Sequence, residues 1–159
     1  MQLHSERITG FSDIIEFSHL SEVLSPSEVV SFLNEYYQLM TEVVKQHKGS
    51  VIQFVGDEIF ATFIDPELYS DNEANAGYFA LEMMDSLPKL NQKYKERFGT
   101  EIKIGIGINF GEAVAGNLGS EERIRYSVTG DFVNPGKRIE SVTMDFPNSI
   151  LVYEVLGIK

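Results

Sequence analysis

Residues 50–64 have the sequence Ser50-Val-Ile-Gln-Phe-Val-Gly-Asp-Glu-Ile-Phe-Ala-Thr-Phe-Ile64. Two runs rich in β-branched and aromatic residues flank Gly56-Asp57-Glu58, and this pattern predicts a β-hairpin with an acidic tip. An Asp in such a Gly-Asp turn is, taken alone, more often a turn residue than a ligand. The meaning of Asp57 therefore depends on which other segments lie beside the hairpin.

A second acidic strand end lies near the amino terminus. Residues 6–13 predict a short strand that ends at Asp13, and residues 14–22 predict a short helix. An Asp in this position usually caps a helix or forms a turn, so it is a weak signal by itself. If the strands are neighbours, however, Asp13 and Asp57 can share two divalent cations roughly 4 Å apart, because such ions prefer hard oxygen ligands.

Two long helices are expected around the hairpin. Ser25-Pro-Ser-Glu28 has the form of a capping box, so the first helix should run to about His47 and stop at Gly49. Its predicted buried face consists of Val30, Leu33, Tyr37, Met40 and Val44. The second helix follows a polar loop over 65–72, includes Pro88 as a potential kink, and has an apolar stripe of Ala76, Ala80, Met83, Leu87, Leu90 and Tyr94.

The rest of the chain predicts more sheet. Residues 101–109 alternate Ile with small or polar residues, and Gly111 and Gly116 indicate a second hairpin ending near Leu118. After it we expect, in chain order, a projecting charged stretch over 119–125, a strand over 126–130, a helix from Asp131 to about Val142, and a strand over 149–155. The element order indicates a mixed α+β fold.

Composition restricts the possible functions. At 159 residues and 43% hydrophobic content, the chain has the size of one globular domain. A net charge of −11 argues against binding of polymeric DNA or RNA, so a bound phosphate needs local neutralisation by metal. The absence of cysteine excludes a thiolate nucleophile, a disulfide framework and a zinc–thiolate cluster.

No stretch approaches the roughly 18 apolar residues of a membrane span. We expect a cytoplasmic domain that does not itself insert into a membrane, whether free or part of a larger tethered protein.

A third segment contains an amide and a guanidinium side chain in place of paired acids. Its sequence is Tyr126-Ser-Val-Thr-Gly-Asp-Phe-Val-Asn-Pro-Gly-Lys-Arg138. Asn134 and Arg138 are four residues apart and are expected on one helix face. An amide and a guanidinium placed in this way can hold a ribose and a pentavalent phosphorane. In isolation, the same pair would be interpreted as part of a solvated helix surface.

Together, in this order and at these separations, the three segments resemble the class III adenylate and guanylate cyclase catalytic domain. The resemblance extends over nearly the whole chain and includes the connecting sequences Leu24–Val30, Leu33–Tyr36, Ile104–Glu112 and Ala115–Glu121. It implies a ferredoxin-like α+β fold with an antiparallel-rich central sheet and flanking helices. It also implies a head-to-tail homodimer with each active site built across the interface.

The resemblance assigns roles to particular residues. Asp13, Asp57 and the backbone carbonyl of Ile14 would bind two Mg²⁺ or Mn²⁺ ions in one protomer, while Asn134 and Arg138 come from the other. The 3′-hydroxyl of a nucleoside triphosphate would attack the α-phosphorus, and Arg138 would stabilise the developing charge. Substrate-binding positions implied in the same way are Phe11, Gln53, Ser127 and Asp131.

The base that the site accepts is less clearly defined. The family selects its base largely through a Lys and through an Asp or Thr, and the matching positions here are Gln53 and Ser127. Both side chains can donate or accept hydrogen bonds to a purine edge. We expect ATP rather than GTP, with guanylate and pyrimidine nucleotide cyclases as open alternatives.

Departures from the family pattern keep other functions open. Glu16 replaces the usual Gly in the turn after Asp13, and Pro135-Gly136 separates Asn134 from Arg138. These two departures favour a catalytically weak or purely regulatory cyclase-like domain as one alternative. Gly56-Asp57-Glu58 also resembles the Gly-Gly-Asp-Glu-Phe turn of diguanylate cyclases. The segment containing Asn134 and Arg138 argues against that second alternative.

The carboxyl-terminal segment departs as well. Residues 148–152 and 153–156 are similar to two separate family strands joined directly, without a stretch that contains a phosphate-binding Lys. Either this chain is shortened near 152–153, or the sequence omits residues there. We favour the second explanation, because the family uses this stretch as a mobile loop beside the substrate.

Overall fold

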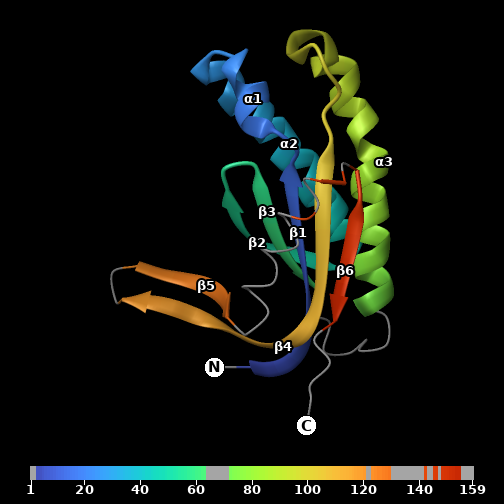
Figure 1. The fold of residues 1–159 in the computed structure, drawn as a ribbon. Coiled ribbons are helices and arrows are strands. Elements are labelled where there is room, and N and C mark those ends of the chain that lie inside the picture. The colour runs from blue at the N-terminus through green and yellow to red at the C-terminus, as the bar shows by residue number, and fades with distance from the viewer. Residues whose placement is uncertain are drawn as a thin grey trace.

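The computed structural model describes residues 3–63, 72–120, 123–129, 142, 145–146 and 148–154. Its elements follow one another as shown in Figure 1. They are β1 (Leu3–Ile14), α1 (Phe17–Glu22), α2 (Pro26–Gln46), β2 (Gly49–Val55), β3 (Glu58–Phe63), α3 (Asn72–Phe98), β4 (Ile104–Ser120), β5 (Arg123–Thr129) and β6 (Ile150–Glu154).

The strands form one mixed sheet of order β2-β3-β1-β4-β5, with β6 paired to β4. Only the β4–β6 pair is parallel among the described strand pairs. The succession β1, α2, β2, β3, α3, β4 with the order β2-β3-β1-β4 is the ferredoxin-like arrangement. The predicted fold class, with its antiparallel-rich sheet, is therefore confirmed.

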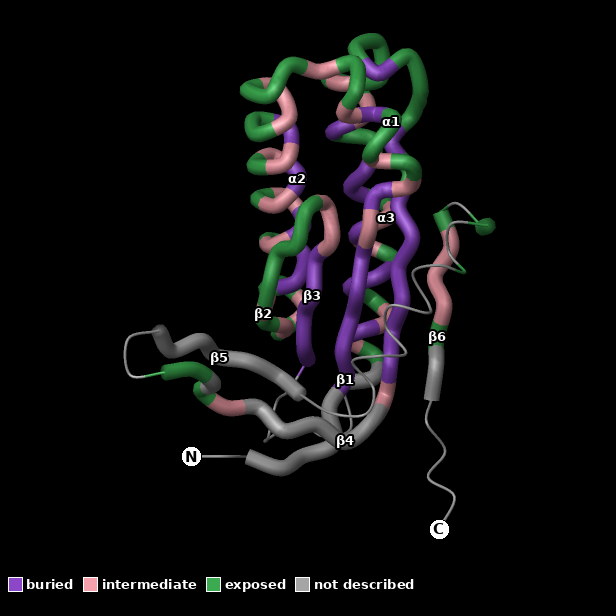
Figure 2. The backbone as a smooth tube through the Cα atoms, turned by 60° about the vertical axis from the view of Figure 1, so that its left-hand side comes forward, coloured by how far each residue is buried: buried purple, intermediate pink, exposed green. Residues whose placement is uncertain are grey.

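Helices α2 and α3 cover the same face of the sheet (Figure 1, Figure 2). A Cβ atom on Gly10 of β1 would lie 2.8 Å from the Phe79 ring of α3, and Ser12 of β1 contacts Tyr36 of α2. Because side chains alternate along a strand, Phe11 and Asp13 must point to the opposite face. The candidate site residues of β1 therefore lie on the face away from the two long helices.

The core fills the space between this sheet and the helices. Isoleucines on alternate positions of β1 and β4 supply most of the strand side of the core, and aromatic and Met side chains supply the helix side. The largest fully buried members are Phe32, Tyr36, Met40, Ile59, Phe63, Phe79, Met83, Ile102, Ile104, Ile106 and Ile108. Among the described helices, none is both long enough and apolar enough to cross a membrane.

Helix α2 begins as predicted but buries a partly different face. The Ser25 hydroxyl accepts from the Glu28 amide, and the Glu28 carboxylate accepts from the Ser25 amide, so the capping box is confirmed. The buried residues are Phe32, Tyr36, Met40, Val43 and Val44. The prediction for Val30 was wrong, since that side chain is 58% exposed. Apolar residues occupy two overlapping stripes on α2, and only the docked sheet decides which of them is covered.

The predicted stop at Gly49 was wrong. Lys48 has the left-handed backbone (φ 59°), and Gly49 is already the first residue of β2. A Cβ atom at Gly49 would lie 2.6 Å from the Phe63 ring and 2.9 Å from Val44. This glycine therefore permits close packing between β2, β3 and α2 and does not end the helix.

The hairpin predicted around Gly111 and Gly116 was also wrong. Strand β4 continues without a turn from Ile104 to Ser120. It pairs with β1 as far as Ala115 and with β5 from Val114, so pairing with β1 holds Gly111, and pairing with β5 holds Gly116, in extended backbone. Figure 1 shows the end of β4 and β5 extending away from the rest of the sheet as an arm.

The amino-terminal boundaries shift for a related reason. Strand β1 spans Leu3–Ile14 because β4 pairs with its whole length, ending at the pair of Ile14 and Ile104. The Ile15 amide then donates to the Lys103 carbonyl at 2.9 Å. Glu16 follows in the left-handed region, so the short helix begins at Phe17 and not at Ile14 as expected.

The second helix agrees with expectation. The buried stripe of α3 includes five of its six predicted members, and Tyr94 packs against the core from a partly buried position. Pro88 lies inside the helix, which continues to Phe98. The strand expected over 149–155 is β6, a single strand parallel to β4, while the absence of a family stretch near 152–153 stays a prediction.

Candidate active site

Asp13 is the penultimate residue of β1 and is half-buried. Its Cα pairs with that of Gly105 on β4, so the neighbouring strand presents no side chain beside it on this face. One oxygen of the Asp13 carboxylate accepts the Ile14 amide at 3.1 Å. The carboxylate is thereby turned toward the end of the strand.

Asp57 lies in the two-residue turn between β2 and β3. Gly56, with φ 59°, takes the left-handed position that begins this tight turn. Register places Ser12 of β1 opposite Ile59 of β3, and continuing the antiparallel alignment by two residues brings the turn beside Ile14. The predicted hairpin tip therefore lies at the carboxyl end of β1.

The structure brings the two carboxylates together at a single backbone amide. The Ile14 amide donates to Asp57 at 3.0 Å as well as to Asp13 at 3.1 Å. The two accepting oxygens consequently lie within about 6 Å of each other, close enough for the carboxylates to share cations spaced by roughly 4 Å.

Two tyrosines of α2 lie behind these carboxylates and were not predicted as site residues. The hydroxyls of Tyr36 and Ser12 are 3.3 Å apart, and the Tyr37 hydroxyl donates to the Gly56 carbonyl. Burial raises the pKa of Tyr36, and the negative charges of Asp57 and Asp13 raise this pKa further, while the hydrogen bond to Ser12 opposes the rise. Tyr36 is therefore a neutral hydroxyl close to both acids.

Two of the predicted substrate positions, Phe11 and Gln53, lie on strands that flank Phe60 of β3. Phe11 is buried and stacks on Phe60 of β3, with ring centroids 4.5 Å apart. Gln53 is exposed on β2, and its Cα pairs with that of the same Phe60, just after an irregularity in the β2–β3 register. Ser127 belongs to β5, where its Cα pairs with that of Gly116. Asp131, Asn134 and Arg138 lie outside the described residues.

The donor set can be compared with the needs of a divalent cation. No group of three or more His, Cys, Asp or Glu side chains suited to a metal occurs in the part of the chain that the structure describes. Two carboxylates and a backbone carbonyl are hard oxygen donors, and Mg²⁺ is commonly held by one or two carboxylates plus substrate phosphates. Asp13, Asp57 and Ile14 fit such a nucleotide-dependent site better than a closed protein cage.

The ferredoxin-like sheet and its convergent acids define an α+β domain with an oxygen-donor site at the end of its central strand. Residues 2–154 match the family model described as the adenylate and guanylate cyclase catalytic domain, and the chain belongs to this family.

Individual relatives support this assignment. The chain is 38% identical over 141 residues to "Adenylate cyclase 1" of Rhizobium meliloti (strain 1021), a match that covers 89% of this chain and 21% of that protein. The crystal structure of the guanylyl cyclase Cya2 is similar with a TM-score of 0.80 and 38% identity, covering 88% of this chain and 71% of that one. The crystal structure of the adenylyl cyclase CyaB from P. aeruginosa has a TM-score of 0.85 and 28% identity, covering 96% and 78%.

Proposed function

We propose that this chain is one cytoplasmic catalytic domain that converts ATP to 3′,5′-cyclic AMP and pyrophosphate by a two-metal mechanism at a homodimer interface. The observation that carries the proposal is the meeting of Asp13 and Asp57 at the Ile14 amide. Two carboxylates on one backbone donor repel each other, and a bound cation would offset this repulsion. Family membership supplies the reaction class.

In this mechanism, Asp13 and Asp57 would hold two Mg²⁺ or Mn²⁺ ions with the help of the Ile14 carbonyl. The ions, when bound, lower the pKa of the 3′-hydroxyl and neutralise the phosphates. The 3′-oxygen forms a bond to the α-phosphorus, the bond to the bridging oxygen of pyrophosphate breaks, and the hydroxyl proton leaves to solvent. The buried carboxyl-terminal half of β1 and the tight β2–β3 turn keep both acids in place before the nucleotide arrives.

The second half of the site is proposed to come from another copy of the chain. Asn134 of the partner subunit would orient the ribose, and Arg138 of the partner subunit would stabilise the charge that develops on the phosphorane. Asp13 and Phe11 lie on the sheet face that α2 and α3 leave uncovered, which suits a composite site. In each dimer, two such sites would form.

Base selection is proposed to rest on Gln53 and Ser127, with Phe11 and Asp131 also near the nucleotide. The exposed Gln53 amide can donate to or accept from a purine edge. The Rhizobium relative is named an adenylate cyclase, which favours ATP, whereas the similar structure Cya2 is a guanylyl cyclase. We therefore assign ATP as the substrate and GTP as the competitor to be tested.

The test measures pyrophosphate release with Mn²⁺ and each of the four nucleoside triphosphates, with products identified by mass spectrometry. We expect cyclic AMP from ATP, and a loss of at least about 100-fold in Asp57→Ala. Asp85→Ala, which removes an exposed carboxylate from α3, is the matched control and should retain full activity. Equal turnover in both variants would contradict the proposed role of Asp57.

A regulatory cyclase-like domain that binds nucleotide, or only a sister domain, and does not turn over is the second candidate. It is favoured by Glu16, which places an exposed acid in the turn directly after the proposed metal site. An anionic side chain there would repel a triphosphate. No pyrophosphate release by the native chain with any of the four triphosphates would establish this candidate over the enzyme, and release gained in Glu16→Gly would assign the loss of turnover to Glu16.

A further inference from the structure

Consecutive tyrosines on α2 each contact the residue that directly precedes a proposed metal ligand. Tyr36 reaches Ser12, which precedes Asp13, and Tyr37 reaches Gly56, which precedes Asp57. Successive residues of an α-helix point about 100° apart, so neighbouring side chains of one helix can reach two different strands. One rigid element thus touches both acidic segments.

The Tyr36 contact acts on β1. Tyr36 has no exposed surface, Ser12 is 1% exposed, and their hydroxyls are 3.3 Å apart. Since Ser12 and Asp13 are adjacent in a strand, their side chains point to opposite faces. Holding the Ser12 side chain on the helix face therefore fixes the backbone from which the Asp13 carboxylate projects on the other face.

The Tyr37 contact acts on the hairpin tip. The Tyr37 hydroxyl donates to the Gly56 carbonyl, and its ring stacks on Phe54 of β2 with centroids 4.2 Å apart and planes 25° apart. This hydrogen bond is exposed to solvent, so water competes for the carbonyl and the bond alone contributes little. The ring stack adds a second restraint on the strand that leads into the turn.

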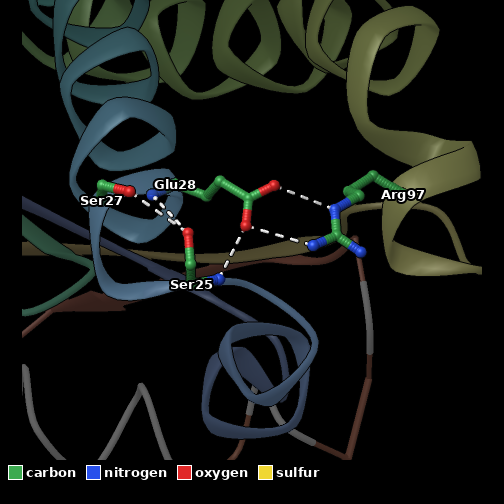
Figure 3. Close-up of polar contacts among 4 residues, drawn as sticks. All are labelled: Ser25, Ser27, Glu28 and Arg97. Atoms are coloured by element: carbon green, nitrogen blue, oxygen red, sulfur yellow. Dashed lines mark hydrogen bonds and ion pairs between the residues drawn. The ribbon is translucent and has the colours of Figure 1, made fainter.

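Helix α2 is itself anchored at the end that precedes the tyrosines. Figure 3 shows the Glu28 carboxylate between the Ser25 amide at 2.7 Å and the Arg97 guanidinium of α3, with both contacts to Arg97 at 3.1 Å. The helix can therefore serve as a fixed reference for both strands.

We propose that Tyr36 and Tyr37 are positioning residues that set the separation of the Asp13 and Asp57 carboxylates and so tune cation affinity. This rests on the proposed function, since it assumes that the two acids bind cations. Neither tyrosine touches the reacting atoms in this scheme. The tyrosines act through the backbone at Ser12 and Gly56.

The experiment compares Tyr36→Phe and Tyr37→Phe with the native chain. The measured quantity is the Mn²⁺ concentration for half-maximal pyrophosphate release at saturating ATP. We expect this concentration to rise about threefold to tenfold in Tyr36→Phe, which loses a buried hydrogen bond, and about twofold in Tyr37→Phe, which keeps the ring stack. Ser12→Ala should reproduce the Tyr36→Phe effect, and the double variant should add nothing further.

The matched control is Tyr94→Phe. It also removes a hydroxyl that contacts α2, because Tyr94 donates to Glu35, but Glu35 adjoins neither acid. A purely structural role of the tyrosine pair would lower the urea midpoint in all three variants and leave the Mn²⁺ dependence unchanged in each. That result would overturn the proposal, whereas a change in Mn²⁺ dependence confined to Tyr36 and Tyr37 supports it.

Failure of the proposed function is distinguished by measuring Mn²⁺ binding directly by electron paramagnetic resonance in the presence of 3′-deoxy-ATP, which lacks the attacking hydroxyl and so cannot turn over. If the native chain binds Mn²⁺ through Asp57 but makes no cyclic nucleotide, the enzyme assignment fails while weaker binding in Tyr36→Phe still supports the positioning role. Equal Mn²⁺ binding in Tyr36→Phe and the native chain refutes the positioning role, even where turnover is intact. A native chain that binds no Mn²⁺ refutes both.

Discussion

Three residues other than glycine adopt positive φ among the described residues: Glu16 at 56°, Lys48 at 59° and Asn148 at 56°. The left-handed backbone conformation costs a residue with a Cβ atom about 1–2 kcal/mol, although Asn adopts this conformation more readily than most residues. The Asn148 side chain also accepts the Ile104 amide at 3.2 Å. The strain is therefore concentrated at Glu16 and Lys48, which follow β1 and α2.

The first prediction concerns Glu16→Gly. Relief of the left-handed strain should exceed the added flexibility of the unfolded chain, so the free energy of unfolding should rise by about 0.5–1 kcal/mol. Urea denaturation measures this change. Glu22→Gly, made at the last residue of helix α1, is the control and should lower stability by up to about 1 kcal/mol. A drop in stability for Glu16→Gly would show that its backbone is not strained.

A pair of glycines gives the second prediction. In Gly49→Ala, the new methyl group would lie 2.6 Å from the Phe63 ring, so we expect a loss of about 1–3 kcal/mol in unfolding free energy. In Gly77→Ala, inside α3, a Cβ atom has nothing within 4 Å, and we expect a gain of up to about 1 kcal/mol. Thermal or urea unfolding of both variants checks the opposite signs. Equal shifts would argue against close packing at Gly49.

At the scale of elements, α2 and α3 are joined by charges at their surface. The hydrogen bond from Arg97 holds the pKa of the Glu28 carboxyl down to about 2, and the hydrogen bonds to Ser25 lower this pKa as well. The Lys93 ammonium similarly lowers the pKa of Glu35, which it contacts at 2.6 Å. Both carboxylates therefore bind their partners better when they are ionised.

A third prediction follows for pH. Because the pKa of Glu28 is depressed in the folded state, its contribution is present above the unfolded value of about 4.5 and is lost as pH falls toward 2. The difference in stability between the native chain and Glu28→Gln should be constant above about pH 5 and shrink below it. Urea unfolding from pH 7 to pH 3 measures this difference.

The control for the pH experiment is Glu96→Gln, which neutralises an exposed carboxylate beside Arg97 on α3. We expect the free energy of unfolding of Glu96→Gln to change with pH in parallel with that of the native chain. The free energy of unfolding of Glu28→Gln should follow the native chain less closely. The Glu28 and Arg97 side chains are 43% and 51% exposed, so salt should weaken the Glu28 effect. A Glu28→Gln difference that stays unchanged down to pH 3 would contradict the assignment.

For the whole molecule, the two faces of the sheet have different roles. Helices α2 and α3 pack on one face, and β1 turns Phe11 and Asp13 to the other. The proposed active site combines the acids of one protomer with the amide and guanidinium of a second. Activity should consequently depend on the dimer and not on the folded chain alone.

Mixing two inactive variants tests this arrangement. Asp57→Ala and Arg138→Ala should each be inactive alone, while an equal mixture should recover about a quarter of native activity. Half of the dimers are then mixed, and each has one of its two sites intact. The measurement is pyrophosphate release after co-refolding, with the dimer content followed by light scattering. A mixture as inactive as its components would contradict a site shared between subunits.

The features that sequence alone determined are local ones. The Ser25–Glu28 capping box, the Gly56-Asp57 turn and the α3 stripe each depend on residues a few positions apart, where helix and turn geometry leaves little choice. The same local logic failed at Gly111 and Gly116, because pairing with β1 at the first and with β5 at the second outweighs the intrinsic flexibility of glycine.

Only the tertiary structure decided what the acids and tyrosines contact. Ile14 and Asp57 are 43 residues apart, and Ser12 and Tyr36 are 24 apart, so neither contact follows from helical or strand periodicity. The register of β1 against β3 brings Asp57 to the end of β1. The face of α2 that the sheet buries selects Tyr36 over its neighbours. The β1–β3 register and the buried face of α2 both depend on burying the most apolar surface between the sheet and the helices. This is a property of the packed molecule and not of any single segment.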